Sequence, residues 1–340
     1  MCANGRPRRW LLALAAATTA ASLAAGEVER GLCRPDDLLA SLSDPDPRVN
    51  ALLARYNFPA EPFSYELRLA GASEVFRHYR LTFPSPRKWD IPQCNTVEAE
   101  YYVPAKRGRP APAVVVLHIL DGRFAVARLV CRAFAAGGVP SLLVKMPYYG
   151  ERRPAGLDLP DVFLERPERM VWAIEGAVLE VRRAAVWLRR RPEVDPRRVG
   201  IVGVSLGGLV AALATGVDPS LDRNVLILAG GDPAAILWTA PETRFMRERL
   251  AKKGYDLAGV RRLAAAIDPR VFAHRADPRR ILMINATEDR TVARAKTEEL
   301  WKRSGRPKIE WYPAGHYSLA LFIPVILPRA LDFVTRLPPR

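Results

Sequence analysis

Hydrophobic and polar residues follow two patterns along this chain: short apolar runs, and longer segments whose apolar residues recur every three or four positions. The short runs are typical of strands in a parallel sheet with both faces buried. The recurring pattern is typical of helices that pack one face on such a sheet. The predicted core strands are residues 113–118, 141–146, 199–204, 224–231, 280–286 and 308–312.

Two amphipathic helices are predicted between these strands, at residues 123–137 and 168–190. Three earlier segments partly alternate polar and apolar residues, which is typical of antiparallel or edge strands. They lie near residues 64–70, 75–83 and 97–103. We therefore expect a doubly wound α/β fold, in which a mostly parallel central sheet of about eight strands has helices on both faces.

Three segments are predicted along the chain. Residues 1–25 form a signal peptide, residues 26–62 a helical extension, and residues 63–338 one α/β domain. About 315 residues after the signal are enough for one large domain of this kind. Within it, residues 232–275 are long enough for a small helical cap, although plain surface helices fit the same pattern.

The first residues have the pattern of a bacterial secretory signal. Arg6, Arg8 and Arg9 precede an uncharged stretch of small and apolar residues, Trp10 to Ala25, which contains a small-residue cleavage site. That stretch is short for a span of ~20 residues, so we expect no permanent membrane anchor. The pattern predicts export to the periplasm or the medium, and the arginine pair leaves both the general and the twin-arginine routes open.

The net charge of +16 is not concentrated in one region, because the 44 arginines and eight lysines are spread along the chain. No nucleic-acid-binding motif accompanies them, so we expect no nucleic-acid partner. Cys33, Cys94 and Cys131 remain after the signal, and a Cys33–Cys94 disulfide is one open possibility. The cysteines do not have metal-ligand spacing, and we expect neither a metal nor a cofactor.

The candidate nucleophile is Ser205, in the sequence Arg-Val-Gly-Ile-Val-Gly-Val-Ser-Leu-Gly-Gly-Leu at residues 198–209. A buried strand runs directly into this serine and a helix follows it. In such a G-x-S-x-G turn the strand and the helix come very close together, so the flanking residues must be small. Gly203 and Gly207 meet that requirement, and Gly208 adds further space.

A serine hydroxyl needs a general base, and the base needs an orienting acid. Among four histidines, His316 is the preferred base because it follows the predicted strand 308–312, at the strand end where catalytic groups collect. Asp289 is the preferred acid because it follows the core strand 280–286. Glu288 is its direct competitor, since either carboxylate could accept the imidazole N–H.

With these residues the chain resembles the α/β-hydrolase superfamily, in particular its dienelactone-hydrolase-like and acetyl-esterase-like branches. The resemblance covers roughly residues 95–337 and rests on the serine turn, the sequence Ala-Thr-Glu-Asp-Arg-Thr-Val from residue 286, and Ala-Gly-His-Tyr from residue 314. It implies the α/β-hydrolase fold, with Ser205 as nucleophile, Asp289 as acid and His316 as base, in the order typical of that superfamily. Many relatives have glycine where this chain has Ala286, a small change.

The resemblance also implies an oxyanion hole made of backbone N–H groups. Leu206, directly after the nucleophile, supplies one. The second comes from the loop after strand 113–118, where relatives commonly have His-Gly and this chain has His118 followed by Ile119 and Leu120. Either Ile119 or Leu120 can provide the N–H, and His118 is expected to position the loop.

A second segment is expected to contact substrate. The loop that follows strand 141–146 contains Tyr148, Tyr149 and Arg152, which could hold an acyl chain, a sugar or a carboxylate. The arginine could equally be a solvated surface residue.

These residues predict an exported serine hydrolase that acts on a small-molecule carboxylic ester through an acyl-enzyme on Ser205. Hydrolysis of a peptide or amide by the same residues is the first alternative, as in oligopeptidase-like relatives. A non-catalytic binding protein with this fold is the second. The sequence does not specify the substrate or the oligomeric state.

Overall fold

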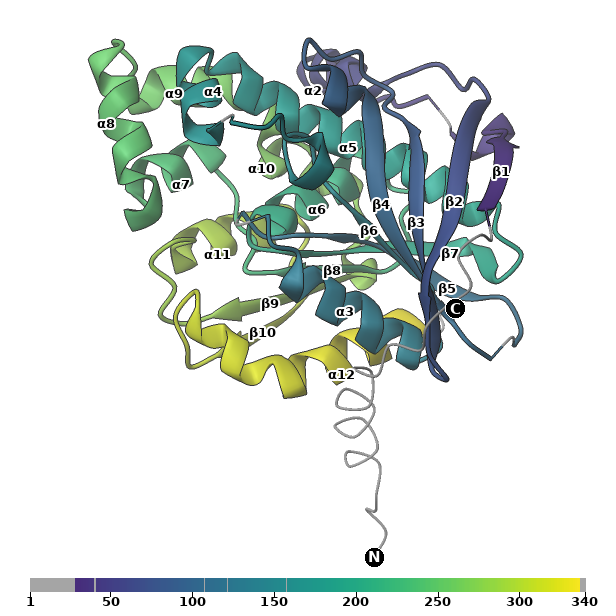
Figure 1. Ribbon diagram of the computed structural model, residues 1–340. Helices are drawn as coiled ribbons and strands as arrows, with labels where there is room; N and C mark the ends of the chain where they lie inside the picture. The colour runs from purple at the N-terminus through teal and green to yellow at the C-terminus, as the bar shows by residue number, and fades with distance from the viewer. Residues whose placement is uncertain (1–27, 40, 107, 121, 157, 337–340) are drawn as a thin grey trace, which may run out of the picture.

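The computed structural model of the chain describes residues 28–39, 41–106, 108–120, 122–156 and 158–336. The predicted signal peptide, residues 1–25, lies outside the described residues, so export stays a prediction. The described part is built around one twisted sheet with helices on both of its faces (Figure 1).

The sheet has ten strands in the order β1-β2-β3-β4-β6-β5-β7-β8-β9-β10. Pairing is antiparallel from β1 through β4 to β6, and parallel from β6 through β5 and β7 to β10. The strands are β1 Val28–Cys33, β2 Phe63–Ala72, β3 Phe76–Pro84, β4 Thr96–Pro104, β5 Ala111–Leu117, β6 Ser141–Val144, β7 Val194–Val204, β8 Asn224–Ile227, β9 Ile281–Ala286 and β10 Lys308–Tyr312. The strands β6, β8 and β9 are fully buried and β5 is buried except at its first residue, and these four strands are the apolar runs of the sequence, as expected for a parallel core.

The expected count of about eight strands is wrong, because the antiparallel side of the sheet extends further than predicted. β1 falls in the segment that was expected to be a helical extension, and it pairs along its whole length with β2. Only Cys33 of this strand is buried, so no run of apolar residues marks it. The edge of β2 supplies the hydrogen-bond partners that make the segment extended.

Helices cover both faces of the sheet. On one face α12, Ile323–Thr335, packs beside α3, Ala125–Ala136, whereas α5, Glu168–Arg189, and α6, Leu206–Val217, pack together on the other (Figure 1). α11, Arg294–Arg303, also contacts β9. The predicted helices at 123–137 and 168–190 are thus present, with shifts of one or two residues at their ends.

The segment between β8 and β9 contains four short helices. α7 Pro233–Thr239, α8 Arg244–Lys252 and α9 Leu257–Leu263 pack on one another and, through α8, on α4, Leu159–Glu165 (Figure 1). We call α4 and α7–α9 the cap. The fourth helix, α10 Pro269–Phe272, packs on α6 and belongs to the body of the domain.

The extension before β2 contains one α-helix, α2 Pro47–Leu53. Tyr56 anchors this segment, because its buried hydroxyl donates a hydrogen bond of 2.5 Å to the Ala266 carbonyl oxygen and its ring packs edge-on against Phe272. The short 3-10 helices are η2 Asp36–Leu38, η3 Ala54–Tyr56, η4 Pro92–Asn95, η5 Gly150–Arg152, η6 Pro241–Thr243, η7 Ala265–Ile267, η8 Ala273–Arg275, η9 Pro278–Arg280 and η10 Ser318–Phe322.

Two further expectations concern cysteines and membrane spans. Cys94 and Cys131 have buried free thiols, so the structure contains no Cys33–Cys94 disulfide.

One helical stretch among the described residues, Ser318–Thr335, is long and apolar enough to cross a membrane, with a mean hydropathy of 1.6. Its α12 part also contacts α3 and β9, and α12 has buried side chains at Ile326, Leu327, Ala330 and Val334.

Candidate active site

Ser205 lies in a sharp turn between the end of β7 and the start of α6. Its backbone has φ 56° and ψ −114°, a conformation that is costly for a residue with a side chain. The Ser205 N–H donates a hydrogen bond of 2.9 Å to the Ile227 carbonyl oxygen of β8, which helps to hold the turn in place. The strained turn exposes the hydroxyl at the carboxyl end of the sheet, as in a nucleophile elbow.

The glycines around Ser205 allow this close approach. A Cβ atom on Gly203 would overlap the carbonyl group of Gly207. A Cβ atom on Gly207 would come within 2.6 Å of the Leu117 carbonyl oxygen, and one on Gly208 within 2.5 Å of the Ile227 carbonyl oxygen. Each contact is with backbone, which cannot rotate away. The small residues of the motif therefore bring the start of α6 against β5 and β8.

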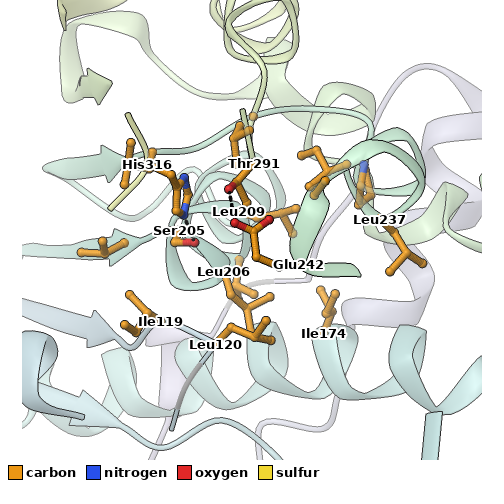
Figure 2. Close-up of a pocket in the computed structure, with 18 of the residues that line it drawn as sticks. Ile119, Leu120, Ile174, Ser205, Leu206, Leu209, Leu237, Glu242, Thr291 and His316 are labelled. Atoms are coloured by element: carbon orange, nitrogen blue, oxygen red, sulfur yellow. Dashed lines mark hydrogen bonds between the residues drawn. The ribbon is translucent and has the colours of Figure 1, made fainter. Parts of the chain in front are cut away.

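His316 and Asp289 complete a chain of hydrogen bonds from Ser205. The Ser205 hydroxyl Oγ is 2.8 Å from Nε2 of His316 (Figure 2). Nδ1 of His316 is 2.7 Å from Oδ2 of Asp289. An ionised carboxylate only accepts hydrogen bonds, so the neutral imidazole has its proton on Nδ1 and offers Nε2 to the serine. The His316 and Asp289 side chains are 8% and 2% exposed.

The turn after β9 directs Asp289, and not Glu288, toward the imidazole. Oδ1 of Asp289 accepts hydrogen bonds of 2.8 Å from the N–H groups of both Thr291 and Val292, which fixes the orientation of the carboxylate. Glu288 is exposed, and its backbone N–H binds the Ala314 carbonyl oxygen beside the histidine loop. The sequence order predicted the three residues of the site, but only the geometry of the turn shows which of the two carboxylates, Asp289 or Glu288, faces the imidazole.

The candidate oxyanion donors surround the serine. Leu206 is the first residue of α6, where helix geometry leaves the N–H without an intrahelical acceptor. Ile119 and Leu120 lie on the loop after β5 and line the same pocket as Ser205 (Figure 2). His118 fixes that loop: its buried ring accepts a hydrogen bond of 3.0 Å from the Met146 N–H and, at Nδ1, lies 2.7 Å from the Ile119 carbonyl oxygen.

Ser205 opens into a pocket of about 560 Å³, a typical size for a small-molecule site. Aliphatic side chains of α5, α6, α12 and the cap form most of its wall. Ile174, Leu209 and Leu237 are among them (Figure 2). Leu120 and Tyr317, two large apolar side chains that are exposed to solvent, also line the pocket. The cavity thus suits a ligand with a large apolar part.

Of the three residues expected to contact substrate, Tyr149 lines the pocket and Tyr148 and Arg152 do not, which corrects the prediction. Tyr148 is buried and its ring packs on Trp89. Arg152 is fully buried and forms a two-pronged ion pair with Glu180 of α5, with N···O distances of 2.7 and 2.6 Å. A buried guanidinium requires such a partner, and the sequence gives no sign that Glu180 lies nearby.

Sequence reasoning missed Glu242, a pocket residue in η6 of the cap. Its Oε1 accepts a hydrogen bond of 2.8 Å from the Thr291 hydroxyl group (Figure 2). It accepts a second one of 2.8 Å from the Tyr317 hydroxyl group. Burial raises the pKa of Glu242, but its own backbone amide and the two hydroxyl donors outweigh burial, so the pKa is lowered overall. No motif marks Glu242, although Tyr317 directly follows His316 and Thr291 lies two residues after Asp289.

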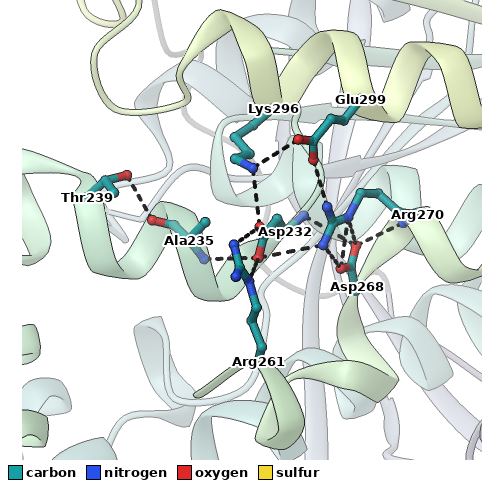
Figure 3. A network of polar contacts seen from close by, with 8 residues as sticks. All are labelled: Asp232, Ala235, Thr239, Arg261, Asp268, Arg270, Lys296 and Glu299. Atoms are coloured by element: carbon teal, nitrogen blue, oxygen red, sulfur yellow. Dashed lines mark hydrogen bonds and ion pairs between the residues drawn. The ribbon is translucent and has the colours of Figure 1, made fainter. Parts of the chain in front are cut away.

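The cap is attached to the domain through Asp232, at the start of α7. This buried carboxylate accepts hydrogen bonds from Arg261 of α9 at 2.8 and 3.2 Å and from Lys296 of α11 at 3.2 Å, and Arg270 of α10 lies beside it (Figure 3). Burial raises the pKa of Asp232, but Arg261, the backbone N–H of Ala235 and the other two cations outweigh burial and lower it to about 2. The network joins two cap helices to the two helices beneath them.

The strained serine turn, the parallel strand order and the Ser205–His316–Asp289 contacts are the features of an α/β-hydrolase fold. The family described as "Alpha/beta hydrolase domain containing 18" matches residues 91–234, which include the serine turn. Two Mycobacterium tuberculosis proteins described as uncharacterized, from strains CDC 1551 / Oshkosh and ATCC 25618 / H37Rv, are each 26% identical over 238 residues. The match covers 68% of this chain but only 56% of each relative, so the chain spans little more than half of their length.

Solved structures show the same fold. An acetyl xylan esterase from Paenibacillus sp. R4 aligns with a TM-score of 0.64 at 14% identity, covering 88% of this chain and 98% of that one. Acetyl xylan esterase 1 from Thermoanaerobacterium sp. JW/SL YS485 aligns with a TM-score of 0.60 at 18% identity, covering 85% and 95%. A Klebsiella pneumoniae protein assigned as a dienelactone hydrolase has a TM-score of 0.53 at 17% identity, covering 77% and 100%. These likenesses confirm the expected fold.

Proposed function

We propose that this protein is a serine hydrolase that cleaves carboxylic esters through an acyl-enzyme on Ser205. The observation that carries the proposal is the continuous hydrogen-bond chain from the Ser205 hydroxyl through His316 to Asp289, at the mouth of an apolar pocket. Structural neighbours titled as esterases support the reaction class.

The geometry supports a two-step reaction. Ser205 Oγ attacks the ester carbonyl carbon while Nε2 of His316 takes the hydroxyl proton, and Asp289 stabilises the imidazolium that forms. The N–H groups of Leu206 and of the Ile119–Leu120 segment would stabilise the negative oxygen of the tetrahedral intermediate. The intermediate then expels the alcohol, which takes the proton from His316. Water attacks the acyl-enzyme by the same route, releasing the acid and restoring Ser205.

The pocket supports an ester with a large apolar group as the substrate. Aliphatic residues make up most of the lining, and the exposed apolar side chains of Leu120 and Tyr317 belong to it as well. Each buried CH₂ group contributes about 0.8 kcal/mol to binding, so longer chains gain affinity until the pocket is full. Polar polymers would gain little from such a wall.

The test combines active-site labelling with a series of p-nitrophenyl esters of increasing acyl length. We expect a fluorophosphonate probe to label the wild-type protein, and kcat/KM to rise from acetate toward longer acyl groups. Ser205→Ala should lose labelling and at least about a thousandfold in turnover. Ser318→Ala, a serine beside the histidine loop, is the matched control and should still be labelled. A wild-type protein that neither reacts with the probe nor turns over any ester would contradict the proposal. Cleavage of peptides but of no ester would show that the substrate is an amide.

We also propose that the protein is exported, on the strength of its first residues: three arginines and an uncharged stretch of small and apolar residues. In a bacterial host, the mature protein should be found outside the cytoplasm with a new N-terminus near residue 25. Recovery of the uncleaved chain from the cytoplasm would contradict export.

A further inference from the structure

We propose that Glu242 determines which esters the pocket accepts: it favours those with an ammonium or another hydrogen-bond donor and disfavours those with a carboxylate. This inference rests on the proposed ester hydrolysis and adds the charge of the substrate. Glu242 lies in η6, between cap helices α7 and α8, and lines the same cavity as Ser205 and His316 (Figure 2).

No lysine or arginine balances the charge of Glu242, and the basic side chain that acts on it across the pocket is His316. Among the described residues that line the pocket, Glu242 is the only acidic one, and none is lysine or arginine. Although the sequence contains 52 basic residues, Glu242 forms no ion pair within the described part of the chain. Its partners are its own backbone amide and the neutral hydroxyl groups of Thr291 and Tyr317. The pocket therefore has a negative charge in a mostly aliphatic wall, where charge interactions are screened less than in water.

One oxygen of the carboxylate is available for a further hydrogen bond. Both hydroxyl groups bind Oε1, whereas Oε2 is buried and has no hydrogen-bond partner among the described residues. Buried polar atoms nearly always have a partner, and each exception calls for an explanation. A hydrogen-bond donor on a bound substrate would give Oε2 of Glu242 a partner, whereas a substrate carboxylate would be repelled by this oxygen.

A purely structural role for Glu242 predicts a different outcome. Its partners Thr291 and Tyr317 are close in sequence to Asp289 and His316, so the carboxylate could simply hold the acid and histidine loops against the cap. In that case its removal would slow the hydrolysis of every ester by the same factor. If Glu242 recognises the substrate, its removal instead changes the ratio of kcat/KM between esters of different charge. This ratio therefore separates the two roles.

The test uses three p-nitrophenyl esters of similar length: the ester of ω-aminohexanoic acid, the hexanoate and the half-ester of adipic acid. In the wild type we expect kcat/KM to be higher for the ammonium ester than for the carboxylate ester, and the ratio of these two values is the quantity compared between variants. Glu242→Gln has the same shape without the charge, and should reduce this ratio by about tenfold, the value of one charge-assisted hydrogen bond. Hexanoate should change less than either charged ester.

Two further variants serve as controls. Glu248→Gln makes the same chemical change on an exposed residue of α8 that pairs with Arg244, and should leave the ratio as in the wild type. Tyr317→Phe removes one hydrogen bond to Oε1 but keeps the charge, and should also retain the wild-type charge preference. Fluorophosphonate labelling and the unfolding temperature of each variant show that the nucleophile and the fold are intact.

The result that would overturn the inference is an unchanged ratio in Glu242→Gln, or an equal loss on all three esters. If the wild type still hydrolyses hexanoate in that case, the proposed ester hydrolysis stands. A wild type that turns over none of the three esters and resists the probe would instead contradict the proposed function itself.

Discussion

Replacing Asp289 with asparagine provides a sharp test of the three-residue site, because the structure predicts which way the new amide must face. In the wild type, Oδ1 accepts two backbone N–H groups at 2.8 Å and Oδ2 accepts the imidazole N–H at 2.7 Å. Asparagine has one acceptor oxygen and one NH₂ donor. If its NH₂ faced the two backbone donors, both N–H groups would lose their acceptor, at about 1–3 kcal/mol each.

The less costly arrangement keeps the amide oxygen on the two backbone N–H groups and turns the NH₂ group toward Nδ1 of His316. A donor at that position holds the neutral imidazole with its proton on Nε2, so the ring no longer accepts the Ser205 proton. The loss of the correct tautomer in a triad of this kind lowers kcat by about 10⁴-fold, or about 5.4 kcal/mol in activation free energy. The fold should change little, because the two backbone hydrogen bonds remain.

The assay is kcat for a p-nitrophenyl ester, measured beside the unfolding temperature. Glu288→Gln is the matched control, since it makes the same change on the neighbouring exposed carboxylate and should keep kcat within about threefold of the wild type. A larger loss in Glu288→Gln than in Asp289→Asn would refute the assignment of the acid. Equal activity of Asp289→Asn and the wild type would refute the triad.

Three other substitutions test the surroundings of the site. His118→Asn should lower kcat by about tenfold with little change in KM, because the loop that contains Ile119 and Leu120 loses its anchor; an unchanged kcat would exclude this loop as an oxyanion donor. Gly203→Ala should lower the unfolding free energy by about 1–3 kcal/mol, since the new methyl group overlaps backbone, and a denaturation midpoint equal to the wild type would contradict the close packing. Asp232→Asn should lose at most about 2 kcal/mol of stability at neutral pH. Because the folded pKa of Asp232 lies below its ordinary value, its contribution to the unfolding free energy is full above about pH 4 and disappears as the pH falls through about 2. The unfolding free energies of wild type and variant should therefore converge in a series of acid denaturations. A difference that stays constant with pH would contradict this origin.

The chain sequence predicted those parts of the fold that depend on continuous apolar runs. β5, β6, β8 and β9 are buried on both faces, and each appears in the sequence as such a run. β1 was missed because one buried residue in six leaves no pattern, and the strand forms through pairing with β2. Local periodicity reports burial, whereas edge strands depend on a partner that is distant in sequence.

The candidate site divides in the same way. Ser205 was found from the glycines around it, and His316 and Asp289 from their positions after core strands, because these signals are local. The partner of Arg152, Glu180, lies 28 residues further along on α5, so a buried ion pair was mistaken for a substrate contact. Glu242 was missed for the same reason: only the packed cap brings it against Thr291 and Tyr317.

The most direct test of the account is the identification of the residue that becomes acylated. The protein should be mixed with a slowly hydrolysed p-nitrophenyl ester, quenched in acid, digested and analysed by mass spectrometry. We predict a burst of about one nitrophenolate per protein molecule and an acyl mass shift on the peptide that contains Ser205, both absent in Ser205→Ala. Turnover of the ester with acylation at another residue, or with no change in Ser205→Ala, would contradict the central claim.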